Sequence, residues 1–496
     1  MEEHVSFGAL NYVVLTVYLA AMLGVGALVA GKQRTTEDFF LAGRTMPWWA
    51  VAMSVFATIT SAITYMGIPG LVYRENVSAY VGILMMPVAA PFIIWLFLPF
   101  YKKLRVTTSY EYIDRRYGRR ARYCVSTLFV CARMGWLGTV IYAPALALAT
   151  VTGIPLWLAI VLMGVLATTY TALGGLSAVI WTDVAQFLIL FGGALIIAAS
   201  LAWNVPGGTA EIFRLARETN HLNLGDWSFD LARMTMSAVC IAYFFQFMHD
   251  YGVDQVTVQR LMATPKLGGM VRATIGNSIF SVVIIGVLTY IGLGLFAYHT
   301  AFPDRLPDGT EGDKIFPYYV VHALPQGISG LVIAGIFAAA MSSMDSGINS
   351  LSTVVVHDFL KNLRSTEKSE EHDVKTARVL TVVFGGLATL VAFFAASIGD
   401  IVKTSQSFLG LFSGPVLALF LLGILTKRGS FAGWLIGLAV AIPSTIWIQN
   451  KTTVHFVYYF PYSFLSCYVI AVFASAFLSA KNVDPQLTIW GQRKSQ

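Results

Sequence analysis

Residues 54–70 read Ser-Val-Phe-Ala-Thr-Ile-Thr-Ser-Ala-Ile-Thr-Tyr-Met-Gly-Ile-Pro-Gly, a stretch rich in hydroxyl side chains that ends in glycine and proline. Where a membrane-spanning helix unwinds, its freed carbonyls can coordinate a small cation, and the next half-helix can face a substrate anion. Small residues at a close contact between two helices would give a similar composition. The stretch alone is compatible with a broken helix and with a packing interface.

The chain around this stretch is too apolar for a soluble fold. Of its 496 residues, 56% are hydrophobic and 12% are charged, whereas soluble proteins average about 25% charged residues. Apolar windows long enough to cross a hydrocarbon core of about 30 Å recur along the sequence. They predict an all-α polytopic membrane protein with about thirteen spans, near 8–30, 47–73, 78–101, 121–150, 155–173, 180–203, 234–251, 272–299, 327–359, 376–397, 405–426, 431–448 and 455–479.

The charged residues orient these spans. An odd number of spans places the two termini on opposite sides of the membrane. Most of the 33 lysines and arginines, Arg260 among them, fall in alternate loops and in the C-terminal tail. The positive-inside rule places those loops in the cytoplasm, so we expect an external N-terminus and a cytoplasmic C-terminus. The net charge of +7 then reflects topology, and no nucleic-acid partner is expected.

The span near 327–359 carries a polar stripe. Residues 335–350 read Gly-Ile-Phe-Ala-Ala-Ala-Met-Ser-Ser-Met-Asp-Ser-Gly-Ile-Asn-Ser, and the helical spacing puts several of the polar groups on one face. Asp345 sits beside this face. A carboxylate at membrane depth is costly unless it is paired, protonated or bound to an ion. Hydroxyl, carbonyl and carboxylate oxygens suit a hard cation, so the stripe predicts an ion site.

Three further polar features each have two interpretations. Asp183 is either an intramembrane carboxylate or the N-cap of the span near 180–203. The polar run 245–252 either interrupts the seventh span, as a repeat partner of 54–70, or forms its cytoplasmic mouth. Arg133 either extends to the membrane interface or clamps a substrate carboxylate.

The sequence offers little for enzyme chemistry. It contains no H-E-x-x-H, G-x-S-x-G or Walker-type motif and no Cys/His cluster. The longest external loops, about 204–233 and 300–326, are too short to suggest a separate domain. We therefore expect one transmembrane domain over 1–496 that acts as a transporter or channel rather than an enzyme.

In these polar spans and their surroundings the chain resembles the sodium/solute symporter family, whose members carry sugars, proline, pantothenate, iodide, monocarboxylates and sialic acid. The resemblance covers nearly the whole chain. It rests on blocks in the family's order: DFFLAGR at 38–44, SVFAT at 54–58, TSYEY at 108–112, GG at 174–175, WTDVAQ at 181–186, DQ at 254–255, QR at 259–260, AAAMSS at 338–343, GP at 414–415 and GI at 423–424.

The resemblance implies the LeuT-type fold, an inverted repeat of five plus five helices. A leading helix would cover 8–30, the first repeat about 47–203, the second about 234–426, and two trailing helices 431–479. This arrangement agrees with thirteen spans and an external N-terminus. In it, the span near 47–73 is the first core helix and the span near 327–359 is the eighth.

The family's shared sodium site lies between those two core helices. Carried over by position, its ligands would be the carbonyls of Ala57, Thr60 and Ala339 and the hydroxyls of Ser342 and Ser343.

Some members have a second sodium site, which Asp183, Ser342 and Ser346 match. Asp345 stands where the sialic-acid branch has serine. The added carboxylate either strengthens cation binding or takes up a proton.

The resemblance also implies a substrate site, near Ile59, Ser61, Thr64, Ile83, Trp136 and Gln246. The sialic-acid branch has its carboxylate-binding arginine at the position of Trp136 and a glutamine at that of Ile83. Arg133, one turn earlier, could replace that arginine if the helix is placed favourably. A small carboxylate and a sugar both stay open as substrates.

We therefore expect a sodium-coupled secondary symporter, with Na⁺ as the coupling ion, that imports a sugar, a sialic-acid-like compound or another carboxylate by alternating access. It would lie in the lipid bilayer of a plasma membrane, the bacterial inner membrane, without an obligatory protein partner. The alternatives are a proton-coupled or sodium-independent carrier that uses Asp345 or Asp183, and a non-transporting sensor or channel.

Overall fold

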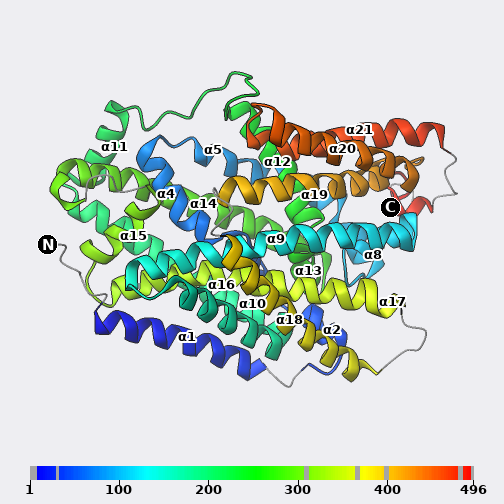
Figure 1. Cartoon of the computed structure of the whole chain (residues 1–496), viewed down its shortest axis with the longest axis horizontal. Helices are drawn as coiled ribbons and strands as arrows, with labels where there is room; N and C mark the ends of the chain where they lie inside the picture. Colours follow the sequence, from blue (N-terminus) through cyan, green and yellow to red (C-terminus); the bar gives the residue numbers. More distant parts are fainter. Residues whose placement is uncertain are drawn as a thin grey trace.

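The computed structural model describes residues 8–29, 33–306, 312–363, 369–395, 401–478 and 484–492, and within these ranges it is helical without strands. Most helices run along the long axis of the molecule (Figure 1). The predicted all-α class is confirmed.

Within the described ranges, nine helices are long and apolar enough to cross a membrane, or ten if one bent pair counts as a single span. Eight of the nine are α1 (Ala9–Val29), α9 (Arg119–Thr152), α10 (Leu156–Asn204), α14 (Leu267–Ala301), α16 (Ile328–Val354), α18 (Glu370–Ala395), α20 (Phe431–Lys451) and α21 (Tyr459–Phe477). The ninth joins α5 (Ala79–Ile83), α6 (Met85–Leu96) and α7 (Leu98–Leu104). The bent pair is α3 (Trp48–Ile59) and α4 (Ala62–Arg74).

The predicted thirteen spans exceed this number for identifiable reasons. α10 covers two predicted spans. α12 (Met236–Gly252) has 17 residues, and the part of α19 (Ile401–Leu425) that counts as an apolar helix is Gly410–Leu425, so both are shorter than the 18 residues asked of a spanning helix. The predicted ends at 30, 397 and 479 lie outside the described residues. The number thirteen stays a prediction.

Shorter elements connect these helices. They are α2 (Thr36–Leu41), η1 (Ala42–Arg44), α8 (Tyr110–Tyr117), α11 (Gly208–Glu218), α13 (Gln255–Met262), η2 (Pro303–Arg305), α15 (Gly312–Ala323), the π-helix η3 (Val355–Leu360), α17 (Lys361–Leu363), η4 (Phe456–Tyr458), η5 (Pro485–Leu487) and α22 (Ile489–Gln492).

Gly175 divides the 49-residue helix α10 in two. Its φ of 56° and ψ of −155° are not helical. A Cβ atom at this position would lie 2.5 Å from the carbonyl oxygen of Phe39 in α2. Glycine is required here because it tolerates the positive φ and lets α2 approach the backbone.

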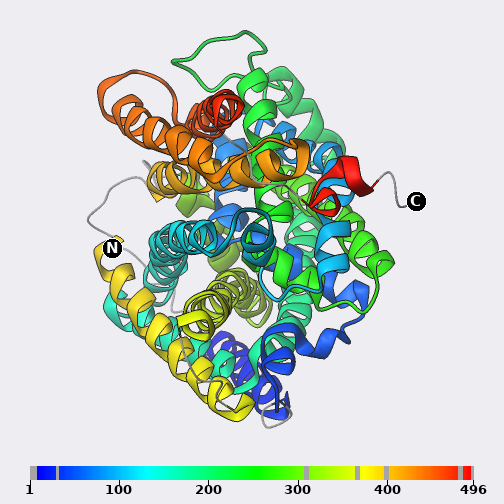
Figure 2. The same cartoon turned by 90° about the vertical axis from the view of Figure 1, so that its right-hand side faces the viewer.

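α16 is the central helix of the bundle. Nearly all of its described residues are buried, the polar ones included, and α10, α1, α9 and α18 pack around it. Figure 2 shows α16 inside the bundle, with α18, α20 and α21 towards its outer edge. The polar stripe predicted on this segment therefore faces protein on all sides.

Two further breaks separate α3 from α4 and α12 from α13. The axes of α3 and α4 differ by 65° across Thr60 and Ser61. The Gly and Pro residues that suggested a break lie further on, inside α4, which runs through Pro69. α12 continues to Gly252, so the predicted interruption at 245–252 is wrong, and the chain leaves the helical path only before α13 begins.

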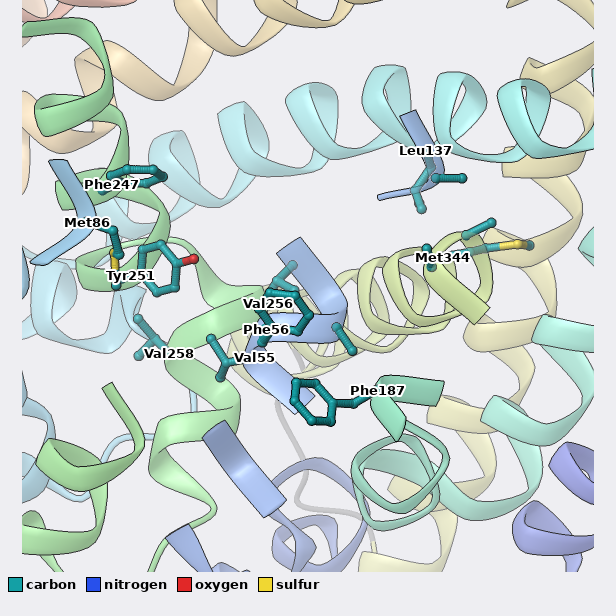
Figure 3. Packing of buried hydrophobic residues seen from close by; sticks show 14 of the residues in the cluster. Val55, Phe56, Met86, Leu137, Phe187, Phe247, Tyr251, Val256, Val258 and Met344 are labelled. Atoms are coloured by element: carbon teal, nitrogen blue, oxygen red, sulfur yellow. The ribbon is translucent and has the colours of Figure 1, made fainter. Parts of the chain in front are cut away.

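Apolar contacts fix α3 between its neighbours. Val55 and Phe56 lie close to Phe187 of α10 and to Val256 and Val258 of α13 (Figure 3). The rings of Phe56 and Phe187 meet edge to face, with 5.4 Å between their centroids. This packing holds the end of α3 against the centre of the bundle.

Candidate functional site

The break between α3 and α4 frees backbone carbonyls. Thr60 has an extended conformation, with ψ of 93°, and its N–H still donates to the carbonyl of Phe56. Ser61 then starts α4, because its Oγ accepts a hydrogen bond from the Thr64 N–H at 3.4 Å. The carbonyls of Ala57 and Thr58, at the end of α3, need partners from elsewhere.

Two serine hydroxyls of α16 supply those partners. Ser342 Oγ donates to the Ala57 carbonyl at 2.7 Å and lies 3.2 Å from the Ala339 carbonyl. Ser343 Oγ donates to the Thr58 carbonyl at 2.7 Å and also lies 3.2 Å from the Ala339 carbonyl. All five residues are buried. Three carbonyl oxygens and two hydroxyl oxygens, the ligand type of hard cations, thus converge where α3 meets α16.

The structure brings together four of the five residues predicted for the shared sodium site: Ala57, Ala339, Ser342 and Ser343. The fifth, Thr60, forms the link between the two half-helices. Thr58 was missed, although its carbonyl is freed by the same break and faces Ser343. Its position next to Ala57 in the quoted motif was the available signal.

A second polar group surrounds Asp183. Its Oδ2 accepts a hydrogen bond from Ser54 Oγ at 2.5 Å and lies 3.4 Å from Arg260 Nη2. Arg260 also donates to Ser54 Oγ at 2.9 Å and contacts Ser346 Oγ. Asp183 lies about two turns beyond Gly175 inside α10, so its interpretation as an N-cap is wrong.

Arg260 was also placed wrongly. The charge pattern predicted a cytoplasmic loop position for Arg260, but this residue lies in α13 and is fully buried. A buried guanidinium needs a charged partner, and Asp183 supplies one. The only sequence signal for this role was the Gln259-Arg260 motif.

Asp345 completes this polar group. Its Oδ2 accepts a hydrogen bond from Tyr170 at 2.7 Å and its Oδ1 from Ser346 Oγ at 3.0 Å. Asp183 and Asp345 are both buried, and two carboxylates in one buried group repel each other when both are ionised. The group thus contains two buried carboxylates and the single guanidinium of Arg260, which leaves one negative charge to be balanced when both carboxylates are ionised.

The predicted substrate residues lie on four parts of the bundle. Ile59, Ser61 and Thr64 lie at the break, Ile83 ends α5, Trp136 lies on α9 and Gln246 lies on α12. α5 and α12 touch directly, since a Cβ atom at Gly82 would lie 3.3 Å from the Tyr243 ring. Except for Ser61, which is buried, these residues are partly exposed.

Arg133 is already paired. It forms a buried ion pair with Asp254, and its guanidinium lies 4.6 Å from the centre of the Trp136 ring. The interpretation that Arg133 extends to the membrane interface is wrong, because its side chain is 8% exposed and ends on Asp254. Its role as a substrate clamp stays a prediction that requires this pair to open.

Known proteins resemble the chain along nearly its whole length. The profile of the sodium:solute symporter family matches residues 39–440. A sodium/sialic acid symporter of Aliivibrio fischeri is 34% identical over 92% of this chain and 91% of its own. A sodium/sialic acid symporter of Proteus mirabilis is also 34% identical, over 92% of this chain and 93% of its own.

A solved structure gives the same result. The substrate-bound, outward-open state of a Na⁺-coupled sialic acid symporter superposes with a TM-score of 0.91 at 32% identity, covering 96% of this chain and 100% of that one. The predicted family, and sodium as the coupling ion, are confirmed. The chain belongs to the sodium:solute symporter family.

Proposed function

We propose that this chain imports a small organic solute together with sodium by alternating access, and that the sodium binds where α3 meets α16. Its ligands would be the carbonyls of Ala57, Thr58 and Ala339 and the hydroxyls of Ser342 and Ser343. The observation that carries the proposal is the pair of 2.7 Å contacts from the two serines to the freed carbonyls. The Thr60 carbonyl, which the family resemblance adds to this set, would be a further ligand, because Thr60 lies at the break with an extended backbone.

Sodium at this position would be coupled to solute binding through the break. The sodium ion that joins α3 to α16 would also fix the link at Thr60, and Ser61 and Thr64 follow that link directly in the chain. Whatever sodium adds to solute affinity, solute must add to sodium affinity, because the coupling free energy is reciprocal.

The solute would bind beside the break, near Ile59, Ser61, Thr64, Ile83, Trp136 and Gln246. Two relatives are named as sialic acid symporters, which supports a sugar, a sialic-acid-like compound or another carboxylate as the solute class. A carboxylate would need Arg133 to leave Asp254.

The proposed architecture is one transmembrane domain with thirteen spans, an external N-terminus and a cytoplasmic C-terminus. The repeats would cover about 47–203 and 234–426, between the leading helix 8–30 and the trailing helices 431–479. The break between α3 and α4 in the first range and the break between α12 and α13 in the second support this division. The bacterial relatives support a bacterial inner membrane as the location.

The melting temperature of the purified protein in sodium and in equimolar choline tests the sodium site. A ligand that binds only the folded state raises the melting temperature, so the wild type should melt higher in sodium. Ser343→Ala should lose most of this sodium-specific difference. Ser352→Ala is the matched control, because Ser352 is a buried, hydrogen-bonded serine of the same helix, α16.

Unchanged sodium stabilisation in Ser343→Ala would reject the site, and no stabilisation of the wild type would reject sodium binding. The alternative is that Asp345 binds and releases a proton. Its hydrogen-bond partners Tyr170 and Ser346 are uncharged hydroxyls, and neither would hold the carboxylate ionised as the partner in an ion pair would. Uptake driven by a pH gradient without sodium would support that alternative.

A further inference from the structure

A groove of about 640 Å³ lies between α6 and α14. Its walls include Pro87, Pro91 and Ile94 of α6 and Ile275, Ile279 and Val283 of α14. The three α14 side chains are among the large apolar groups exposed on the outside of the molecule, so the groove opens towards the hydrocarbon of the bilayer. Its volume lies in the range of pockets that hold small ligands.

The groove has one end close to the start of α14. α6 and α7 run towards this end, where Lys102 Nζ of α7 donates a hydrogen bond to the Pro265 carbonyl, two residues before α14 begins. Ile94 and Ile275 are the lining residues nearest to this end in the sequence of their helices. The proposed topology places this end of both helices at the cytoplasmic surface.

Basic side chains surround the same end. Arg272 precedes Ile275 by three residues and Ile279 by seven, so it continues the stripe of α14 that lines the groove. Lys103 and Lys266 lie at the adjoining ends of α7 and α14, and all three basic residues are exposed. In the described part of the chain, no acidic side chain forms an ion pair with any of them. Three positive charges are thus available to an external anion.

Two tryptophans indicate the depth of this end in the membrane. Trp95, next to Ile94, is 50% exposed, and Trp48 is 39% exposed. The Trp48 ring is close to α14, because a Cβ atom at Gly276 would lie 3.6 Å from it. Exposed tryptophans are enriched at the level of the lipid headgroups. Arg272, one turn beyond Gly276 towards the surface, therefore lies where a lipid phosphate would be.

We propose that an anionic phospholipid binds at this end, with an acyl chain in the groove between α6 and α14 and its phosphate on Arg272. The Arg272 guanidinium matches the geometry of a phosphate, and Lys103 and Lys266 add to the positive field. Basic residues at a cytoplasmic helix end are common, but here they stand over an apolar groove, which is how headgroup and chain are recognised together. This site lies outside the proposed sodium and solute sites, and only its leaflet rests on the proposed topology.

Lipid titrations of the melting temperature test the site in purified, delipidated protein. A ligand of the folded state raises the melting temperature in a saturable way. Phosphatidylglycerol should do so, whereas phosphatidylcholine with the same acyl chains should need at least about fivefold more lipid for the same rise, because one basic contact contributes about this factor. Glycerol phosphate, which has the anion without the chains, should give no rise.

Variants assign the effect to the groove. Arg272→Gln should shift the phosphatidylglycerol midpoint about fivefold upwards, and Ile279→Trp, which fills the groove, should abolish the saturable rise. Arg120→Gln and Leu390→Trp are the matched controls and should titrate like the wild type. Arg120 is an exposed arginine at the start of α9, and Leu390 of α18 is 56% exposed, as Ile279 is.

Three results would overturn the proposal. Equal titrations of the wild type and Arg272→Gln would remove the phosphate contact, and an equal rise with phosphatidylcholine would remove the preference for an anion. A lipid-free dimer that Ile279→Trp dissociates would assign the groove to a second copy of the chain. If Ile279→Trp does not fold, Arg272→Gln decides, because its side chain is exposed.

Discussion

At the scale of single residues, Arg133 shows how a charge can serve structure where the sequence suggested substrate binding. It joins α9 to the start of α13 through Asp254. Asp254 also caps α13, because its Oδ1 accepts a hydrogen bond from the Val256 N–H at 2.8 Å. One carboxylate thus neutralises an intramembrane arginine and satisfies the amide end of a half-helix.

Replacing Arg133 should therefore destabilise the protein. In Arg133→Ala the Asp254 carboxylate would stay buried without its cation, and the loss should be about 3–5 kcal/mol. Adding Asp254→Asn should recover much of it, because asparagine also caps helices. Equilibrium unfolding in detergent measures both effects. Wild-type stability in Arg133→Ala, together with lost binding of an organic acid, would instead make Arg133 a substrate clamp.

At the scale of helices, the apolar windows located most elements but not their breaks. The sequence suggested a break from the Gly and Pro residues of 54–70, yet α4 runs through Pro69 and the chain unwinds at Thr60 and Ser61. The difference has a physical cause. The freed carbonyls are satisfied by Ser342 and Ser343, about 285 residues away, and no local pattern reports such a contact.

Gly175 provides a test at the same scale. Gly175→Ala should destabilise the protein by about 1–3 kcal/mol, because the residue has a positive φ and its new Cβ would collide with the Phe39 carbonyl. Gly192→Ala, on the same helix, should be neutral or slightly stabilising, since its Cβ meets no atom within 4 Å. Thermal unfolding compares the two variants. Equal stability would mean that α10 is not pinned at Gly175.

At the scale of the whole molecule, composition and the recurring apolar windows were enough to predict an all-helical membrane protein, and the quoted motifs were enough to predict its family. They were not enough to place Arg260, whose partner Asp183 lies 77 residues away. Its charge looked like a topological signal because loop arginines are common on the cytoplasmic side. The balance of two buried carboxylates against one guanidinium appears only when α10, α13 and α16 are assembled.

The central claim, that sodium is held between α3 and α16, is tested most directly by equilibrium binding of ²²Na⁺ to the purified protein. The wild type should bind sodium saturably, Ser343→Ala should lose one bound ion per chain or bind it at least about tenfold more weakly, and Ser352→Ala should bind like the wild type. Binding in Ser343→Ala that equals the wild type in stoichiometry and affinity would contradict the account.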